Sequence, residues 1–84
     1  MLQLKIVSPE KIVFDGEVQQ VIVPGTVGRF EILVGHAPII SSLEDGVVEY
    51  TTPDGERSQF PILGGFVEVK KNKVSLCVEC DGHK

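Results

Sequence analysis

Hydrophobic residues in the last third of the chain recur at every second position, which is the period of an extended strand. Val67 and Val69 alternate with Phe, Glu and Lys, and Val74, Leu76 and Val78 alternate with Ser, Cys and Glu. Successive side chains of a strand point to opposite faces, so residues two apart share a face. These five residues are therefore predicted to form the buried face of a hairpin.

Similar short runs, rich in β-branched and aromatic residues, fill most of the chain, and no helical period interrupts them. Dipeptides that favour tight turns separate the runs: Asp15-Gly16, Pro24-Gly25, Asp45-Gly46, Asp54-Gly55 and Lys71-Asn72. Nine short strands in 84 residues predict a single all-β domain, a sandwich or a barrel. The predicted strands are 2–7, 11–14, 17–24, 28–34, 37–43, 46–52, 56–63, 65–70 and 73–79.

Four of these runs are apolar at consecutive positions and so place apolar side chains on both faces of a strand. They are Val21-Ile22-Val23, Ile32-Leu33-Val34, Ile39-Ile40 and Ile62-Leu63. Either both faces of these strands are buried within the domain, or part of the apolar surface meets a partner. The pattern alone leaves both interpretations open.

The charge balance narrows the classes of partner. Eight Lys and Arg residues stand against 12 Asp and Glu, which gives a net charge of −4. A chain of this kind lacks the basic field that holds a nucleic-acid backbone, so nucleic acid is not an expected partner. No apolar run approaches the roughly 18 residues of a membrane helix, and residues 1–11 do not resemble a signal peptide. A soluble protein of a reducing compartment is expected.

The tail "CVECDGHK" (77–84) carries a C-x2-C pair, Cys77 and Cys80, followed by His83. Positions three apart on a strand lie about 10 Å apart and point to opposite faces, which is too far for a disulfide or for shared metal ligation. Cys77 and Cys80 could come together only if the strand frayed after Leu76. Even then Cys77, Cys80 and His83 would be three ligands without the second ligand pair of a structural zinc site. Two free thiols and no bound metal are expected, with adventitious oxidation or metal binding as the alternative.

The remaining chemical candidates predict no active site. His36 precedes Ala37-Pro38 in an extended context, and neither Ser41 nor Ser42 lies in a nucleophile-elbow motif. The glycine-rich stretch 24–28 lacks the Lys-Ser/Thr and the helix of a phosphate loop. The chain is therefore expected not to be an enzyme and to bind no cofactor.

One alternative function of another class involves Lys71. A lysine at a tight β-turn is how lipoyl and biotinyl carrier domains present their cofactor. Lys71 lies near the C-terminus rather than between two similar halves, which argues against this alternative. An acyl adduct on Lys71 in native protein would establish it.

A resemblance covers nearly the whole chain. The matching motifs are, in order, Ser8-x-Glu10, Phe14-x-Gly16, Val23-x-Gly25-x-x-Gly28, Ile32, Gly35-His36-Ala37-Pro38, Leu43-x-x-Gly46, Gly64-Gly65-Phe66-x-Glu68-Val69 and Asn72-x-Val74. In these motifs the chain closely resembles the N-terminal domain of the epsilon subunit of F-type ATP synthase, which is the delta subunit in mitochondria. The resemblance implies a flattened β-sandwich of about nine to ten short strands over 1–84.

The resemblance also implies a non-catalytic adapter of the rotating central stalk. Such a domain binds the gamma subunit, rests on the polar loops of the membrane c-ring, and meets the F1 alpha/beta assembly indirectly. Ser8, His36, Ala37 and Pro38 match positions facing gamma, and Arg29, Phe30 and Glu31 match the tip that meets the c-ring. Some members carry an acid where Arg29 stands, so Glu31 is the alternative source of that charge.

Most members continue into a C-terminal helical hairpin that can restrain ATP hydrolysis. Because this chain stops at Lys84, that helical domain is expected to be absent, and coupling without the restraint is expected. The implied location is the cytoplasmic face of a bacterial plasma membrane, peripheral to it through the ATP synthase complex.

Overall fold

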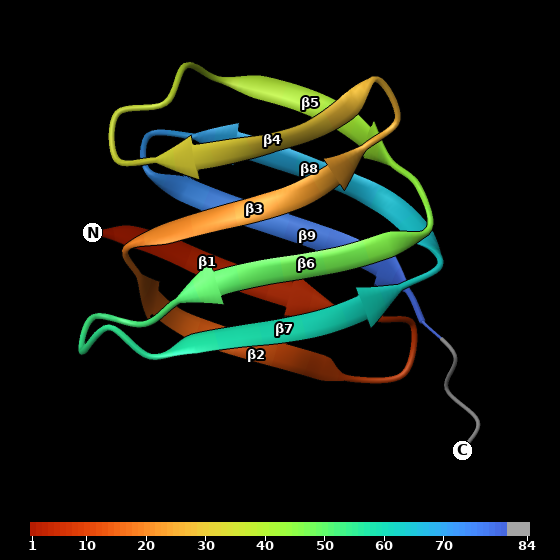
Figure 1. Cartoon of the computed structure of the whole chain (residues 1–84), viewed down its shortest axis with the longest axis horizontal. Coiled ribbons are helices and arrows are strands. Elements are labelled where there is room, and N and C mark those ends of the chain that lie inside the picture. The colour runs from red at the N-terminus through yellow and green to blue at the C-terminus, as the bar shows by residue number, and fades with distance from the viewer. Residues whose placement is uncertain (81–84) are drawn as a thin grey trace.

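The computed structural model describes residues 1–80, which form nine strands and no helix (Figure 1). No segment among them is therefore a helix of the length and apolarity that a membrane crossing requires. The described strands agree in number and order with the nine predicted ones. Their bounds are β1 (Leu2–Val7), β2 (Ile12–Val18), β3 (Gln20–Gly25), β4 (Gly28–Leu33), β5 (Ile39–Leu43), β6 (Gly46–Thr51), β7 (Arg57–Ile62), β8 (Gly64–Lys70) and β9 (Lys73–Glu79).

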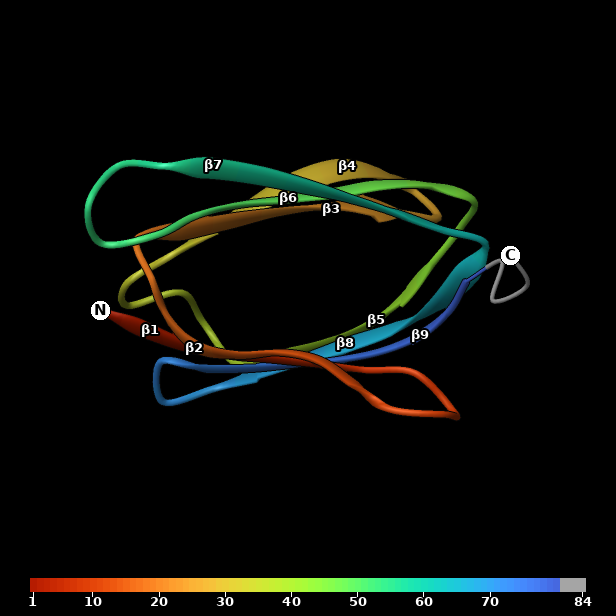
Figure 2. The same ribbon diagram turned by 90° about the horizontal axis from the view of Figure 1, so that it is seen from below.

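The strands pack as two layers (Figure 2). One, here called the terminal layer, has the strand order β2-β1-β9-β8-β5; the other, the central layer, contains β3, β6 and β7 with β4 paired to β3. The layers join where Gly25 of β3 pairs with Leu43 of β5, so hydrogen bonding is continuous around one side. The chain measures 34 × 27 × 18 Å, which confirms the predicted flattened sandwich.

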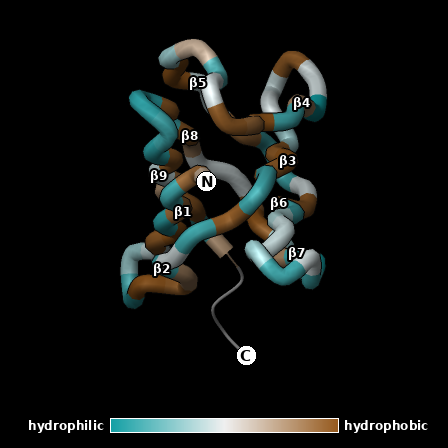
Figure 3. Tube along the Cα trace, turned by 90° about the vertical axis from the view of Figure 1, so that its left-hand side faces the viewer, coloured by the Kyte–Doolittle hydropathy of each residue, from teal (hydrophilic) through white to brown (hydrophobic). Residues whose placement is uncertain are grey.

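The core lies between the two layers, and its buried hydrophobic side chains are all aliphatic. Hydrophobic residues occur along the strands of both layers (Figure 3). The hairpin predicted from alternation is confirmed, because each of its five aliphatic side chains is at most 3% exposed. The remaining fully buried side chains lie on the inward faces of β1, β2, β3, β4, β6 and β7, and along β1 and the first part of β3 they alternate with less buried residues. They include Leu2, Leu4, Ile6, Val18, Val21, Val23, Ile32, Val48 and Ile62.

Two predicted turns are wrong. Asp15-Gly16 lies inside β2, paired with Lys5 and Leu4 of β1, and Pro24-Gly25 lies at the end of β3, ahead of the hairpin turn at 26–27. Gly25 is required for packing: a Cβ there would lie 2.8 Å from the carbonyl oxygen of Gly28. The sequence pattern assigned Gly25 to a turn, whereas in the structure Gly25 allows two strands to pack closely.

The predicted turn at Lys71-Asn72 is confirmed. Both residues have positive φ, 52° and 63°, which is the conformation of a two-residue type I′ hairpin loop. The turn joins β8 to β9, and β9 in turn lies parallel to β1. The backbone amide of Gln3 donates to the carbonyl of Asn72 over 2.8 Å, so the hairpin turn is tied to the start of the chain.

Candidate interaction faces

The outer face of the terminal layer exposes an apolar row that crosses four strands. The register of β8, β9, β1 and β2 aligns Phe66 with Cys77, Cys77 with Val7, and Val7 with Ile12. Phe66 is 48% exposed and Ile12 57% exposed, so the row faces solvent rather than the core. We call these four residues the apolar row. A groove of about 520 Å³ beside it is lined by Val7, Ser8, Pro9, Gly65, Phe66, Cys77, Val78 and Glu79.

The rest of this outer face is more strongly charged. In the next register row, Glu68 pairs with Ser75 and Ser75 with Lys5, and at the hairpin end Lys70 lies opposite Lys73. Ile40 of β5, opposite Glu68, adds an apolar side chain that is 74% exposed. The face therefore runs from an apolar end at the start of β8 to a basic end at the β8–β9 turn.

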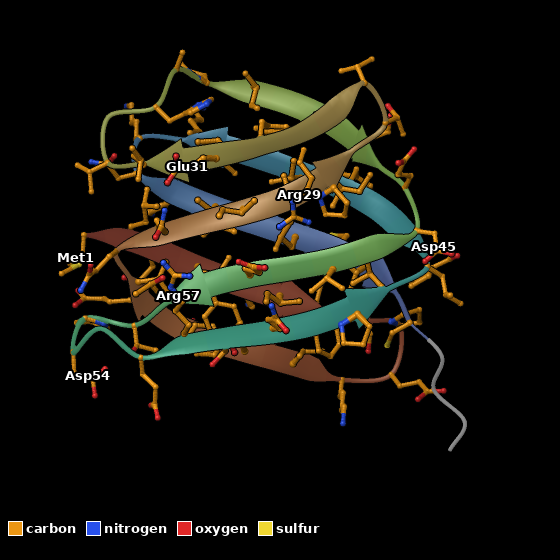
Figure 4. The ribbon with its side chains drawn as sticks, viewed as in Figure 1. Met1, Arg29, Glu31, Asp45, Asp54 and Arg57 are labelled. Atoms are coloured by element: carbon orange, nitrogen blue, oxygen red, sulfur yellow. The ribbon has the colours of Figure 1, made fainter. Side chains whose placement is uncertain are left out.

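The outer face of the central layer carries polar side chains that bind one another across the strands (Figure 4), together with one apolar side chain, Leu33 of β4, that is 49% exposed. Arg29 donates through Nη1 to the carbonyl of Val47 over 3.0 Å, and its Nη2 lies 3.6 Å from a carboxylate oxygen of Glu49. Gln59 donates to that carboxylate over 3.0 Å, while Gln20 donates to Glu31. Because these groups have partners on their own sheet, they would add less to the affinity of a contact than unpaired groups, although exposed charges such as Arg29 and Glu31 can still set its orientation.

The predicted gamma-facing residues lie at the two ends of the terminal layer. Ser8 follows β1 beside the groove, where its backbone amide donates to the carbonyl of Lys11 over 2.9 Å. His36, Ala37 and Pro38 lie in the β4–β5 loop, next to the β8–β9 turn at the opposite end of those strands (Figure 1). The structure therefore does not gather the four into one patch.

The predicted c-ring residues belong to β4, and they do not share a face. Arg29 and Glu31 point outward from the central layer, whereas Phe30 between them is half-buried and packs against the core. Strand alternation separates them in this way. Only Arg29 and Glu31 of the three are thus offered to a partner. The family resemblance matched all three to one tip, and the strand predicted over 28–34 already contained them.

The two cysteines are free in the structure, with Cys77 in the apolar row and Cys80 just beyond β9. Among residues 1–80 no three His, Cys, Asp or Glu side chains are grouped as metal ligands would be. His83, the third predicted candidate, lies outside the described residues. Lys71 is exposed at the β8–β9 hairpin turn.

The exposed β6–β7 loop contains a carboxylate whose titration is altered by a local turn. The hydroxyl of Thr52 donates to the Asp54 carboxylate, and this bond, with that of the Glu56 backbone amide, lowers the pKa of Asp54 from its usual value. A carboxylate held ionised at a solvent-exposed turn stabilises the turn and is not poised for proton transfer near neutral pH.

Sequence reasoning did not find the apolar row. The row needed the register between β1, β9 and β8, which alternation within one strand does not give. The signal was present in part, because Phe66 and Cys77 have the opposite parity to the valines and leucines of their own strands.

Comparison with known proteins places the chain among subunits of one enzyme complex. The family model described as "ATP synthase, Delta/Epsilon chain, beta-sandwich domain" matches residues 1–80. The ATP synthase epsilon chain of Chlorobaculum tepidum is 45% identical over 76 residues, covering 90% of this chain and 86% of the relative. That of Gloeothece citriformis is 40% identical over 77 residues, and the match covers 92% of this chain but only 55% of the relative.

Solved structures show the same fold at lower identity. A chain of the Euglena gracilis mitochondrial ATP synthase, in a structure of OSCP/F1/c-ring, superposes with a TM-score of 0.87 at 23% identity. A chain of the Tetrahymena thermophila mitochondrial ATP synthase, in a structure of the central stalk and c-ring, gives a TM-score of 0.76 at 18% identity. The present chain spans 49% and 63% of their lengths, respectively.

Proposed function

Because the chain belongs to the ATP synthase delta/epsilon family through its β-sandwich domain, we propose that it is a non-catalytic subunit of the central stalk. In this proposal it joins the gamma subunit to the membrane c-ring, so that rotation driven by proton flow is transmitted to the F1 part. The sandwich performs no bond chemistry; its task is mechanical. The similarity to epsilon chains supports this function and not a lipoyl or biotinyl carrier.

The observation that carries the proposal is the difference between the two outer faces. The terminal layer exposes Ile12, Ile40 and Phe66 on three strands, whereas in the described strands of the central layer Leu33 is the one large apolar side chain exposed to this extent. The polar side chains around it bind one another. Burial of apolar surface is the main favourable term in stable association. We therefore assign gamma to the outer face of the terminal layer, with Ser8 at one end and the loop containing His36, Ala37 and Pro38 at the other.

The c-ring contact is proposed at the β4 edge of the central layer. Arg29 and Glu31 are exposed there and present opposite charges to polar loops of a ring. Rim charges of this kind set the orientation and specificity of a contact more than its affinity. The complex that results would hold the chain peripheral to the membrane, on the cytoplasmic side in a bacterium.

The proposal is tested by co-expressing the chain with its cognate gamma subunit and purifying the pair by a tag on gamma. A complex of one chain per gamma that survives gel filtration is expected. Recovery of gamma alone, with folded free chain in the flow-through, would contradict the proposed function.

Replacement of Arg29 by Glu tests the c-ring contact. The ion pair with Glu49 is solvent-exposed on the Arg side, so the free energy of unfolding is expected to change by no more than about 1 kcal/mol. Proton-driven ATP synthesis by the assembled enzyme is expected to fall, since the charge offered to the ring is reversed. Arg57→Glu, at an exposed position on β7 of the same layer, serves as the control. Equal rates for both variants and the wild type would count against this contact.

A further inference from the structure

The side chain of Asn72 bonds to a loop 37 residues away in the sequence. Its Oδ1 accepts the backbone N–H of Gly35 over 2.7 Å, which links the β8–β9 turn to the loop between β4 and β5. Its own backbone carbonyl accepts the N–H of Gln3 over 2.8 Å. Asn72 therefore joins three separate segments of the chain at one point.

The turn holds Asn72 in a fixed orientation. Asn72 has a φ of 63°, in the left-handed region that asparagine tolerates better than most residues. The pairing of Lys70 with Lys73 and the bond to Gln3 set the backbone on both sides of it. Asn72 is half-buried, while its neighbour Lys71 is exposed, so its amide is directed toward the protein.

The loop that receives this bond has a short, defined course. Gly35 has a φ of 86°, and the amide of His36 donates to the carbonyl of Leu33 over 3.0 Å, which closes a tight turn at the end of β4. The Nδ1 of His36 lies 2.8 Å from the carbonyl oxygen of Ala37; because that oxygen can only accept, Nδ1 carries the proton. The turn thus sets the direction in which His36, Ala37 and Pro38 leave β4.

We propose that Asn72 is a positioning residue for partner binding: its side chain holds Gly35 so that the loop 36–38 is presented to gamma in one conformation. The inference rests on the proposed function, because gamma is the partner whose binding would respond. A loop fixed before binding loses less conformational freedom when the complex forms, and affinity rises accordingly. Asn72 need not touch gamma for this effect.

Asn72→Gly tests the role without disturbing the turn. Glycine adopts positive φ without strain, so the hairpin is kept and only the acceptor is lost. The Gly35 amide is expected to exchange with solvent at least about tenfold faster, and gamma affinity to fall by about five- to tenfold. Asn72→Asp keeps an acceptor and is expected to restore both values, whereas Lys71→Gly, at the neighbouring positive φ, is expected to change neither.

Two readouts decide the inference. Unchanged Gly35 exchange in Asn72→Gly, followed by NMR on the free chain, would overturn the contact itself. Faster Gly35 exchange with unchanged gamma affinity would overturn the positioning role. If the wild-type chain does not bind gamma, both the proposed function and the positioning role are wrong. This outcome differs from failure of the Asn72–Gly35 contact, because Gly35 exchange would still become faster in Asn72→Gly.

Discussion

Gly65→Ala is expected to lower the free energy of unfolding by about 3 to 5 kcal/mol, which is enough to unfold much of a small domain. A Cβ at this position would lie 2.1 Å from the carbonyl oxygen of Cys77 and 2.8 Å from the Cα of Val78, both in the backbone of the paired strand β9. Gly65 also has a φ of 143°, which side chains rarely adopt. Neither backbone atom can move without disturbing the β8–β9 ladder. Urea denaturation gives the value.

Gly28→Ala separates the two causes of the stability loss in Gly65→Ala, which are steric overlap with β9 and the positive φ. Gly28 has a similar φ of 133°, but nothing lies within 4 Å of a Cβ built there. Its substitution is expected to cost only the conformational part, about 1 to 3 kcal/mol. If the two variants were equally stable, close packing of β8 on β9 would not be the reason for glycine at position 65.

Phe66→Asp is expected to weaken gamma binding by at least about 100-fold while leaving the fold intact. Phe66 is 48% exposed in the free chain, so a charge there remains hydrated and costs little stability. In the complex the same carboxylate would be buried against an apolar partner surface without a counter-charge, and such burial costs several kcal/mol. Titration calorimetry with purified gamma measures the change.

Gln59→Asp is the matched control for Phe66→Asp. Gln59 lies exposed on β7, on the outer face of the central layer, where we place no gamma contact. The Gln59→Asp substitution introduces the same negative charge, here beside Glu49. The affinity for gamma is expected to remain within about twofold of the wild-type value. A loss of affinity with Gln59→Asp that matches or exceeds that of Phe66→Asp would place gamma on the other face.

Much of the fold could be predicted because local pattern and global structure agree over most strands. The hairpin around Val67 and Leu76 is the clearest case, since alternation, turn residues and burial all indicate the same arrangement. The errors arose at glycines. Gly16 and Gly25 lie within strands, and their role depends on neighbours that are distant in sequence or hidden from a local pattern.

The candidate faces could be predicted only in part, for a related reason. The apolar pairs at Ile39-Ile40 and Ile62-Leu63 indicated surplus apolar surface, and Ile40 and Leu63 are indeed exposed. Which exposed side chains share a face depends on strand register and on how the two layers meet. The bond between Asn72 and Gly35 spans 37 residues and has no signature beyond an asparagine in a turn.

The alkylation rate of Cys77 measures whether gamma covers the outer face of the terminal layer. Cys77 lies in the apolar row, and a Gln59→Cys substitution places a second reporter on the outer face of the central layer. Both are alkylated in the free chain and in the gamma complex, and each site is quantified by peptide mass spectrometry. Gamma is expected to slow alkylation of Cys77 by at least about tenfold and to leave the thiol at position 59 unchanged. Protection of position 59 with an unprotected Cys77 would contradict the account.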